Sequence, residues 1–342
     1  MAKRLVSLTK NKINPKIVAG VIILIGLVGL SFISASLLNS VVNIAISNTN
    51  DNPKGGGNSE PGLIAYYPFD DGSGNIASEK MIQNNGTIFG AQWTNNALLG
   101  KALNFTGPNN YIEIPDNAVL NPTDAITVSV WVKLNKTVAE QTYQYIIINK
   151  SNWNNKEGYQ LLFNKPYTNN LIFRILYENT YKDVAWDASN LKKDVWYHIV
   201  GAYDKSKSEL SLYVDGYLKN VNFLNTPIDV TINKLYISGT GNNYFDGSID
   251  EVKVYFKALT DEEIMDLYEN TRCKRYSGIN LSDLDSKQYE YLTSYPLKLN
   301  TGDINNIKNN YPWINPDNPS ECDKIFIMGM TDAIINSTFS PY

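Results

Sequence analysis

Histidine and cysteine are scarce in this chain, with one His and two Cys among 342 residues. The single histidine, His198, argues against metal sites built from imidazoles and against catalytic triads that depend on a histidine base. The two cysteines, Cys273 and Cys322, are too far apart in the sequence for a CxxC-type metal site. The composition therefore disfavours the common imidazole and thiolate sites.

An excess of positive charge is also missing. The chain has 30 Lys and Arg against 34 Asp and Glu, a net charge of −4, and its isoelectric point is about 5.2. Proteins that bind nucleic acid present a Lys/Arg-rich face, so this balance argues against that class. Asparagine and tyrosine are abundant instead, with 44 Asn and 23 Tyr, which favours loop-rich β structure over a helical bundle.

Only one long hydrophobic run occurs, the 22 uncharged residues Ile17–Leu38. A helix of about 20 apolar residues spans a membrane. All cations of the first 50 residues stand before this run: Lys3, Arg4, Lys10, Lys12 and Lys16. Because basic residues stay on the cytoplasmic side, the sequence predicts a cytoplasmic tail (1–16), a single-pass transmembrane helix (17–46) and an extracellular remainder at the cell membrane.

Two alternatives for this segment stay open. A cleaved signal peptide would end near Ser34, Ala35 and Ser36, although the run is long for that class. A filament subunit would pack the whole of 17–46, a helix of about 45 Å, in a filament core. Many such subunits carry an acidic residue near the start of the helix, and this chain has none there.

The two segments that flank the central region are polar or irregular. Residues 47–62, SNTNDNPKGGGNSEPG, have no core-forming side chain and predict a flexible linker. Residues 271–342 form a C-terminal extension that contains both cysteines. Outside the cell, Cys273 and Cys322 predict one disulfide closing a loop of about 50 residues, with two free thiols as the alternative.

The central region reads as strands, because short runs rich in Val, Ile, Tyr, Phe and Trp alternate with Gly, Asn, Asp and Pro. The clearest predicted strands are Tyr111–Ile114, Ile126–Leu134, Tyr145–Asn149, Tyr159–Phe163, Leu171–Tyr177, Trp196–Tyr203, Glu209–Val214, Lys234–Ser238 and Ser248–Tyr255. Strands without interposed helices predict an all-β fold, an antiparallel sandwich of two sheets.

One short helix is expected at the end of this region. Thr260 and Glu263 have the spacing of a capping box, which marks a helix N-terminus. Ile264, Leu267 and Tyr268 then recur at helical spacing and supply its apolar stripe.

Eight sequence pieces in order resemble one family: LIAYYPFDDGSGN, NNGTIFGAQW, GKALNF, NNYIEIPDN, ITVSVWVKL, DVWYHIVGAYD, LSLYVDGYL and YFDGSIDEVKVYFKALTDEEIMDLY. They are similar to the laminin-G-like domain, a jelly roll of the concanavalin-A-like lectin/glucanase superfamily. The resemblance covers about residues 63–270. It implies two curved antiparallel sheets and an extracellular binding or adhesion module, but it names no ligand.

Catalysis is not expected. Glucanase relatives use paired carboxylates at alternate positions of one strand, where both point to one face. No predicted strand carries that series, because Asp250 and Glu251 are adjacent and the acidic residues from Asp261 on begin a helix. His198 lies in a predicted core strand, is interpreted as structural, and has no serine or cysteine partner that the sequence nominates.

The resemblance implies a structural calcium site, since this fold commonly binds Ca²⁺ between its first strand, a nearby loop and its last strand. The matching positions here are Asp70, Asn110 in the 107–110 loop, and Asp250. Calcium takes six to eight oxygen ligands, and carboxylates and carbonyls supply them. The alternative is that Asp70 opens a turn and that Asp250 pairs with a lysine or accepts hydrogen bonds from backbone amides.

A sugar site requires exposed aromatic rings beside amides or carboxylates. Two loops have that composition, and they nominate Trp153 and Asn154 in one and Tyr244 in the other as ligand contacts. Trp131 and Trp196 lie within strands and are expected in the core. For an exported protein, Asn-x-Ser/Thr sequons predict glycosylation at Asn85, Asn135, Asn149, Asn280 and Asn336.

The sequence thus predicts a membrane-anchored, extracellular, non-catalytic protein whose jelly roll binds carbohydrate or a surface glycoprotein. One alternative is a structural subunit of a surface filament, envelope or virion that self-assembles through the apolar helix. A second is a divergent glycan hydrolase.

Overall fold

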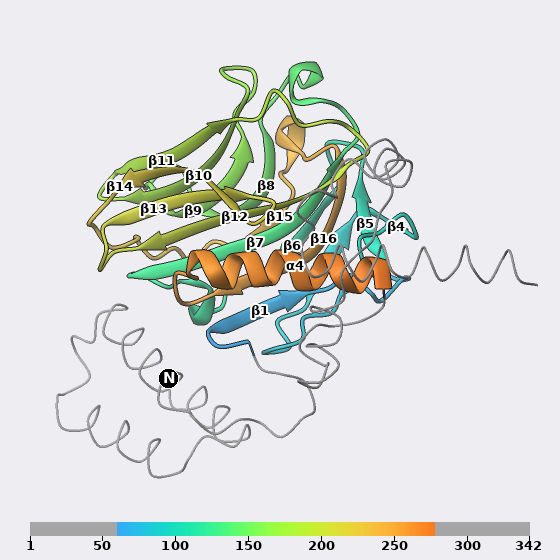
Figure 1. Ribbon diagram of the computed structural model, residues 1–342, viewed down its shortest axis with the longest axis horizontal. Coiled ribbons are helices and arrows are strands. Elements are labelled where there is room, and N and C mark those ends of the chain that lie inside the picture. Colours follow the sequence, from blue (N-terminus) through green and yellow to red (C-terminus); the bar gives the residue numbers. More distant parts are fainter. Residues whose placement is uncertain (1–59, 278–342) are drawn as a thin grey trace, which may run out of the picture.

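The computed structural model describes residues 60–277 (Figure 1). The predicted tail, the apolar helix 17–46, nearly all of the linker, and Cys322, Asn280 and Asn336 lie outside the described residues, as does the side chain of Cys273. Among residues 60–277, no helix has the length and apolar character needed to cross a membrane.

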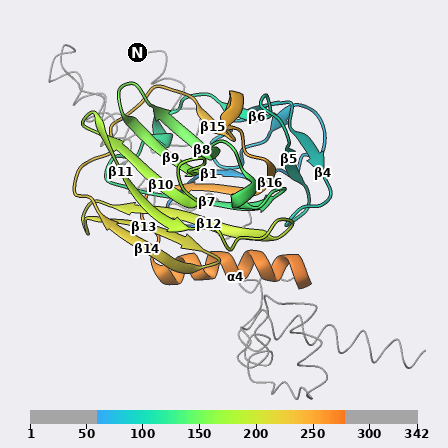
Figure 2. The ribbon, with the colours of Figure 1, turned by 90° about the horizontal axis from the view of Figure 1, so that it is seen from above.

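The described residues form two antiparallel sheets that pack face to face (Figures 1 and 2). Sheet A has the order β14-β13-β12-β7-β16-β5-β4, with β1 also paired to β16. Its strands are β1 (Leu63–Tyr67), β4 (Gln92–Thr94), β5 (Ala102–Phe105), β7 (Ala125–Leu134), β12 (Trp196–Asp204), β13 (Glu209–Val214), β14 (Tyr217–Phe223) and β16 (Gly247–Tyr255).

Sheet B has the order β11-β10-β9-β8-β15-β6-β3-β2. Its strands are β2 (Ile76–Ala77), β3 (Gly86–Phe89), β6 (Tyr111–Ile114), β8 (Tyr145–Asn152), β9 (Glu157–Phe163), β10 (Asn170–Tyr177), β11 (Thr180–Asp187) and β15 (Leu235–Ile237). Within residues 60–277, three short 3-10 helices lie in the loops: Ala118–Leu120, Val138–Glu140 and Gly241–Asn243.

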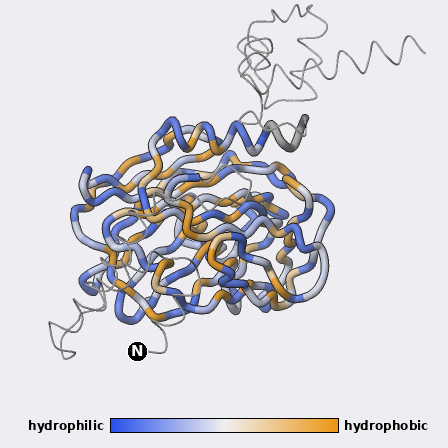
Figure 3. Tube along the Cα trace, turned by 90° about the horizontal axis from the view of Figure 1, so that it is seen from below, coloured by the Kyte–Doolittle hydropathy of each residue, from blue (hydrophilic) through white to orange (hydrophobic). Residues whose placement is uncertain are grey.

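The core lies between the sheets and follows from the alternation of the strands. In β7, Ile126, Val128, Val130 and Val132 are fully buried and face sheet B, because successive side chains of a strand point to opposite faces. Figure 3 shows this alternation of hydrophobic and hydrophilic residues along the chain. The all-β sandwich predicted from the sequence is confirmed, with more strands than the sequence pattern revealed.

Helix α4 (Asp261–Ser277) covers the outer face of sheet A (Figure 2). The predicted capping box is confirmed: the Glu263 backbone N–H donates to Thr260 Oγ1 at 3.2 Å, and the Thr260 N–H donates to Glu263 Oε2 at 2.9 Å. Ile264 is fully buried against Val200, Ala202 and Leu259. The helix continues through residues 270 and 271, where the sequence pattern placed a domain boundary.

Candidate functional site

The outer face of sheet B carries a row of mostly polar side chains that runs across its strands. Neighbouring residues such as Ile112, Leu161 and Phe173 point into the core, so the residues that alternate with them point outward. Cross-strand register aligns the outward positions into what we call the polar ladder: Thr87, Glu113, Tyr236, Asn149, Gln160, Arg174 and Asp183. Helix α4, the one α-helix of residues 60–277, packs on sheet A, so no α-helix of these residues covers the outer face of sheet B.

Hydrogen bonds fix one end of the ladder. Arg174 donates from Nε and Nη2 to the two carboxylate oxygens of Asp183, at 2.7 and 2.8 Å. Gln160 Nε2 donates to Asn149 Oδ1 at 3.2 Å and to Ser151 Oγ at 3.1 Å. A bidentate Arg–carboxylate pair has fixed geometry as well as favourable energy, so the Arg174 guanidinium is held in one orientation.

Two exposed aromatic rings lie over this arginine, and we call Trp153 and Tyr181 the platform. Trp153 is 46% exposed and Tyr181 is 43% exposed, whereas Arg174 beneath them is 6% exposed. The guanidinium carbon of Arg174 lies 4.3 Å from the Tyr181 ring centroid and 5.2 Å from that of Trp153. The Lys156 ammonium lies 3.2 Å from the centroid of the Trp153 ring.

Hairpin turns place the two platform residues. Trp153 lies in the turn of residues 153–156 between β8 and β9, and Gly158, the second residue of β9, has a φ of +93°. A Cβ at Gly158 would lie 1.9 Å from the Lys150 carbonyl oxygen, so only glycine fits there. Tyr181 follows the β10–β11 turn, where Glu178 and Asn179 both have positive φ, as tight hairpin turns require.

A second aromatic cluster lies towards the other edge of sheet B. The rings of Phe89 and Tyr111 stack with centroids 4.8 Å apart, and Tyr236 meets Tyr111 edge-on at 5.9 Å. Beside it, Lys234 Nζ and Glu113 Oε1 form an ion pair at 2.6 Å.

The sequence-predicted ligand contacts are only partly brought together. Trp153 and Asn154 are exposed in the same turn after β8. Tyr244 instead stacks on Tyr145, the first residue of β8, with ring centroids 6.1 Å apart. At 3.2–3.4 Å per residue along the strand, the two sites lie roughly 25 Å apart, so one small ligand does not touch both.

The predicted calcium ligands are likewise divided. Asp70 Oδ1 accepts the Lys101 N–H at 2.9 Å, and Asp250 Oδ2 accepts the Leu98 and Leu99 N–H groups at 3.0 and 3.1 Å. The backbone of residues 98–101 therefore donates hydrogen bonds to both carboxylates. Asn110 Oδ1 accepts the Thr106 N–H at 2.9 Å in a different turn.

Backbone amides already occupy the Asp250 carboxylate. Asp250 Oδ1 also accepts the Glu251 N–H, so this carboxylate has three backbone donors, as the alternative interpretation expected. Burial and the nearby Glu251 raise the pKa of Asp250 well above its usual value. Among residues 60–277, no group of three or more His, Cys, Asp or Glu side chains is arranged to hold a metal ion.

His198 has a serine partner that the sequence did not nominate. Ser129 Oγ lies 2.8 Å from His198 Nε2. The imidazole centroid lies 5.0 Å from that of Trp131 and 6.0 Å from that of Tyr268, and these two rings lie 5.6 Å apart, so the three rings form one cluster. Among the side chains that the structure describes, none pairs with the buried His198 Nδ1, so none of their carboxylates orients the ring as a triad requires. Burial, with a smaller contribution from Lys253, lowers the pKa of His198 to about 3. We assign His198 to packing under α4, and Trp131 and Trp196 are confirmed as core residues.

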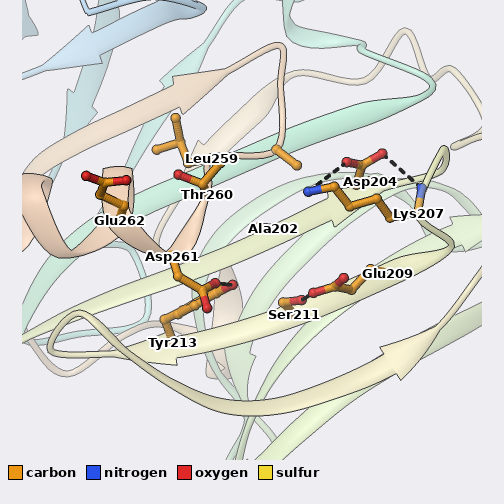
Figure 4. Close-up of a pocket in the computed structure, with 11 residues that line it drawn as sticks. Ala202, Asp204, Lys207, Glu209, Ser211, Tyr213, Leu259, Thr260, Asp261 and Glu262 are labelled. Carbon is orange, nitrogen blue, oxygen red and sulfur yellow. Dashed lines mark hydrogen bonds and ion pairs between the residues drawn. The ribbon is translucent and has the colours of Figure 1, made fainter.

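An open pocket of about 460 Å³ lies between the outer face of sheet A and the start of α4 (Figure 4). It is acidic, but three of its carboxylates are bonded to neighbours. Glu209 accepts the Ser211 hydroxyl at 2.9 Å, and Asp261 accepts the Tyr213 hydroxyl at 2.7 Å. Asp204 accepts the Ser206 hydroxyl at 2.6 Å. These bonds hold the three carboxylates in place around the pocket.

Three predicted sequons lie in the described part of the chain. Asn85 is exposed, and its side chain accepts the Glu79 N–H at 2.9 Å. Asn135 Nδ2 donates to Asp246 at 3.0 Å. Asn149 belongs to the polar ladder, so a glycan there would lie on the outer face of sheet B.

Sequence reasoning missed most of this surface. Tyr181, Arg174 and Asp183 lie in strands or turns whose outward positions depend on the cross-strand register. The sequence does show alternation in GYQLLF and LIFRIL, which places Gln160 and Arg174 opposite the apolar face. It does not show that β9 and β10 align these residues with each other.

The fold and these contacts can now be set against known proteins. Residues 105–265 match the family described as the concanavalin A-like lectin/glucanases superfamily. This segment is a laminin-G-like domain. The match confirms the resemblance over a shorter range than the predicted 63–270, and the laminin-G-like domain includes Trp153, Arg174 and Tyr181. A search of curated proteins found no match.

Solved structures with a similar fold include the binding domain of Paraclostridial mosquitocidal protein 1, with a TM-score of 0.50 and 16% identity over 62% of this chain and 52% of that one. The binding domain of botulinum neurotoxin serotype D has a TM-score of 0.49 and 18% identity, covering 61% of this chain and 51% of that one. The chain thus spans about half the length of these structures. At 16% identity the likeness to the first of these structures concerns the fold alone.

Proposed function

We propose that this protein is a membrane-tethered surface protein whose laminin-G-like domain binds carbohydrate, without catalysis, through the platform on the outer face of sheet B. The observation that carries the proposal is the pair of exposed rings, Trp153 and Tyr181, held over the buried Arg174. Sugars present apolar C–H faces that stack on aromatic rings and hydroxyl groups that pair with amides. The platform and the exposed Asn154 amide next to Trp153 in the chain would supply both kinds of contact.

A glycan array probed with the full chain in detergent micelles tests the binding. Trp153→Ala and Tyr181→Ala are each expected to weaken binding about tenfold or more, as truncation of an aromatic contact commonly does. Tyr217→Ala is the matched control, because Tyr217 is 60% exposed but belongs to sheet A. If the wild-type chain binds no glycan, or if all three variants bind equally, the proposal fails.

The membrane tether rests on the apolar segment 17–46 and its flanking cations. The same segment favours the second candidate function, a filament, envelope or virion subunit, because all 30 of its residues lack charge and a helix of that length would protrude beyond a membrane. Material released from cells by shear distinguishes the two. A tethered binding protein stays with the membrane and dissolves in detergent as a monomer, whereas a subunit is recovered in filaments.

Calcium remains a separate proposal that rests on Asp70 and Asp250. A ligand that binds only the folded state stabilises it by mass action. Chelation is therefore expected to lower the melting temperature of the wild type and to leave that of Asp70→Asn unchanged. The same melting temperature with and without chelator in the wild type would remove the site.

A further inference from the structure

We propose that Arg174 is the positioning residue of the platform and that the platform takes a neutral glycan. This inference rests on the proposed function and adds to it the class of sugar and the residue that orients the two rings. Arg174 itself is buried and touches both rings from beneath.

The orientation of the guanidinium follows from its bonds. The Asp183 carboxylate accepts hydrogen bonds from Nε and Nη2 of Arg174, and Nη1 donates to Gln160 Oε1 at 3.4 Å. Gln160 is held in turn by Asn149 and Ser151. A planar guanidinium fixed in this way offers its flat face to an aromatic ring, which the ammonium of a lysine does not. The guanidinium of Arg174 therefore holds the two platform rings in position before a ligand binds.

The charges of the outer face of sheet B point to a neutral occupant. Arg174 is paired with Asp183, and Glu113 of the ladder is paired with Lys234 beside it, so these four charges cancel. Lys156 remains, and its ammonium lies against the Trp153 ring. A neutral sugar that stacks on Trp153 competes with this ammonium, whereas an acidic sugar would use it as a counter-ion.

A double-mutant cycle tests the positioning role. Its probe is a neutral oligosaccharide series of glucans, mannans and xylans, and its protein is the full chain in detergent micelles. Arg174→Lys keeps the positive charge but loses the fork and the flat face, and it is expected to weaken binding about tenfold, as Trp153→Ala does. The double variant is expected to bind no more weakly than Trp153→Ala alone, because both changes disable one platform.

Additive losses in the cycle, or unchanged binding by Arg174→Lys, would overturn the positioning role. Melting temperature monitors folding, and Asp183→Asn gives a second route to the same release of the guanidinium if Arg174→Lys does not fold. If no wild-type binding to any neutral or acidic glycan is found, the proposed function itself has failed. If Trp153→Ala and Tyr181→Ala weaken binding while the Arg174 and Asp183 variants do not, only this inference has failed.

Salt dependence and Lys156→Met test the charge class. A neutral ligand predicts an affinity that changes less than about twofold between low and high NaCl, because no ion pair is screened, and a Lys156→Met affinity equal to or tighter than that of the wild type. Preferential binding of sialylated, uronic or sulfated glycans, with loss in Lys156→Met and at high salt, would overturn the neutral class.

Discussion

Asp215 illustrates how burial sets the chemistry of a single side chain in this sandwich. It lies in the turn between β13 and β14, where its Oδ1 accepts the His198 backbone N–H at 2.9 Å. Burial raises its pKa to about 6, and the His198 hydrogen bond, Lys219 and Arg272 oppose that shift only in part. The folded state thus holds this proton more tightly than the unfolded state does.

The free energy of unfolding is therefore expected to depend on Asp215 between pH 4 and 7. As the pH falls from 7.5 to 4.5, the wild type should gain about 2 kcal/mol of stability relative to Asp215→Asn, because the folded chain takes up the proton in this window. Asparagine keeps the acceptor oxygen and tolerates the positive φ of this turn. Urea unfolding of both proteins at the two pH values measures the difference. If the difference in free energy of unfolding between the two proteins does not change with pH, Asp215 does not titrate as described.

Residue-scale reasoning from the sequence worked where a residue acts through its own position in a strand. Trp131, Trp196 and His198 were expected in the core, and the structure buries all three. It worked less well for partners, since Ser129 and His198 are 69 positions apart and meet only through the β7–β12 pairing. The contacts of the predicted calcium ligands also depend on distant segments, because one loop joins Asp70 and Asp250 whereas Asn110 lies in a separate turn.

At the scale of elements, the start of α4 was predicted from a short sequence motif alone. The capping box at Thr260 and Glu263 forms as expected, and the first intrahelical bond runs from the Ile264 N–H to the Thr260 carbonyl at 2.9 Å. The predicted boundary at residue 270 came too early: no glycine or proline interrupts the sequence from there to Gly278, and the helix runs to Ser277.

Removal of this cap is expected to destabilise the protein modestly. Thr260→Ala loses the side-chain acceptor for the Glu263 N–H and should lower the free energy of unfolding by about 1 kcal/mol. Thr260→Ser keeps the acceptor and serves as the control. Urea unfolding of the three proteins gives the values, and equal stability of the Ala and Ser variants would mean that the cap contributes nothing.

The strands were predicted best where they are long and alternate clearly, as in β7, β12 and β16. Short strands such as β2 and β4 were missed, because two or three residues carry no period. The platform could not be predicted as a unit, since Trp153 comes from the β8–β9 hairpin whereas Arg174 and Tyr181 come from the β10–β11 hairpin. Only the register of β8 to β11 brings them together.

At the scale of the whole molecule, the charge asymmetry of the first 50 residues predicts the topology. Because the five cations precede the apolar segment, protease added to intact cells should remove the chain beyond about residue 50 and leave a short membrane-protected fragment. Antibodies against the two ends of the chain follow both products. A full-length chain that resists the protease until the cells are permeabilised would contradict this orientation.

The central claim is that the outer face of sheet B binds carbohydrate through the platform. Hydroxyl-radical footprinting of the full chain, with and without a glycan that binds it on an array, measures this directly on the unmodified protein. We expect the oxidation of Trp153 and Tyr181 to fall when the glycan is bound, while that of Tyr217 and Phe223, which are 60% and 74% exposed on β14, stays constant. Unchanged oxidation of Trp153 and Tyr181 in the presence of a bound glycan would contradict the account.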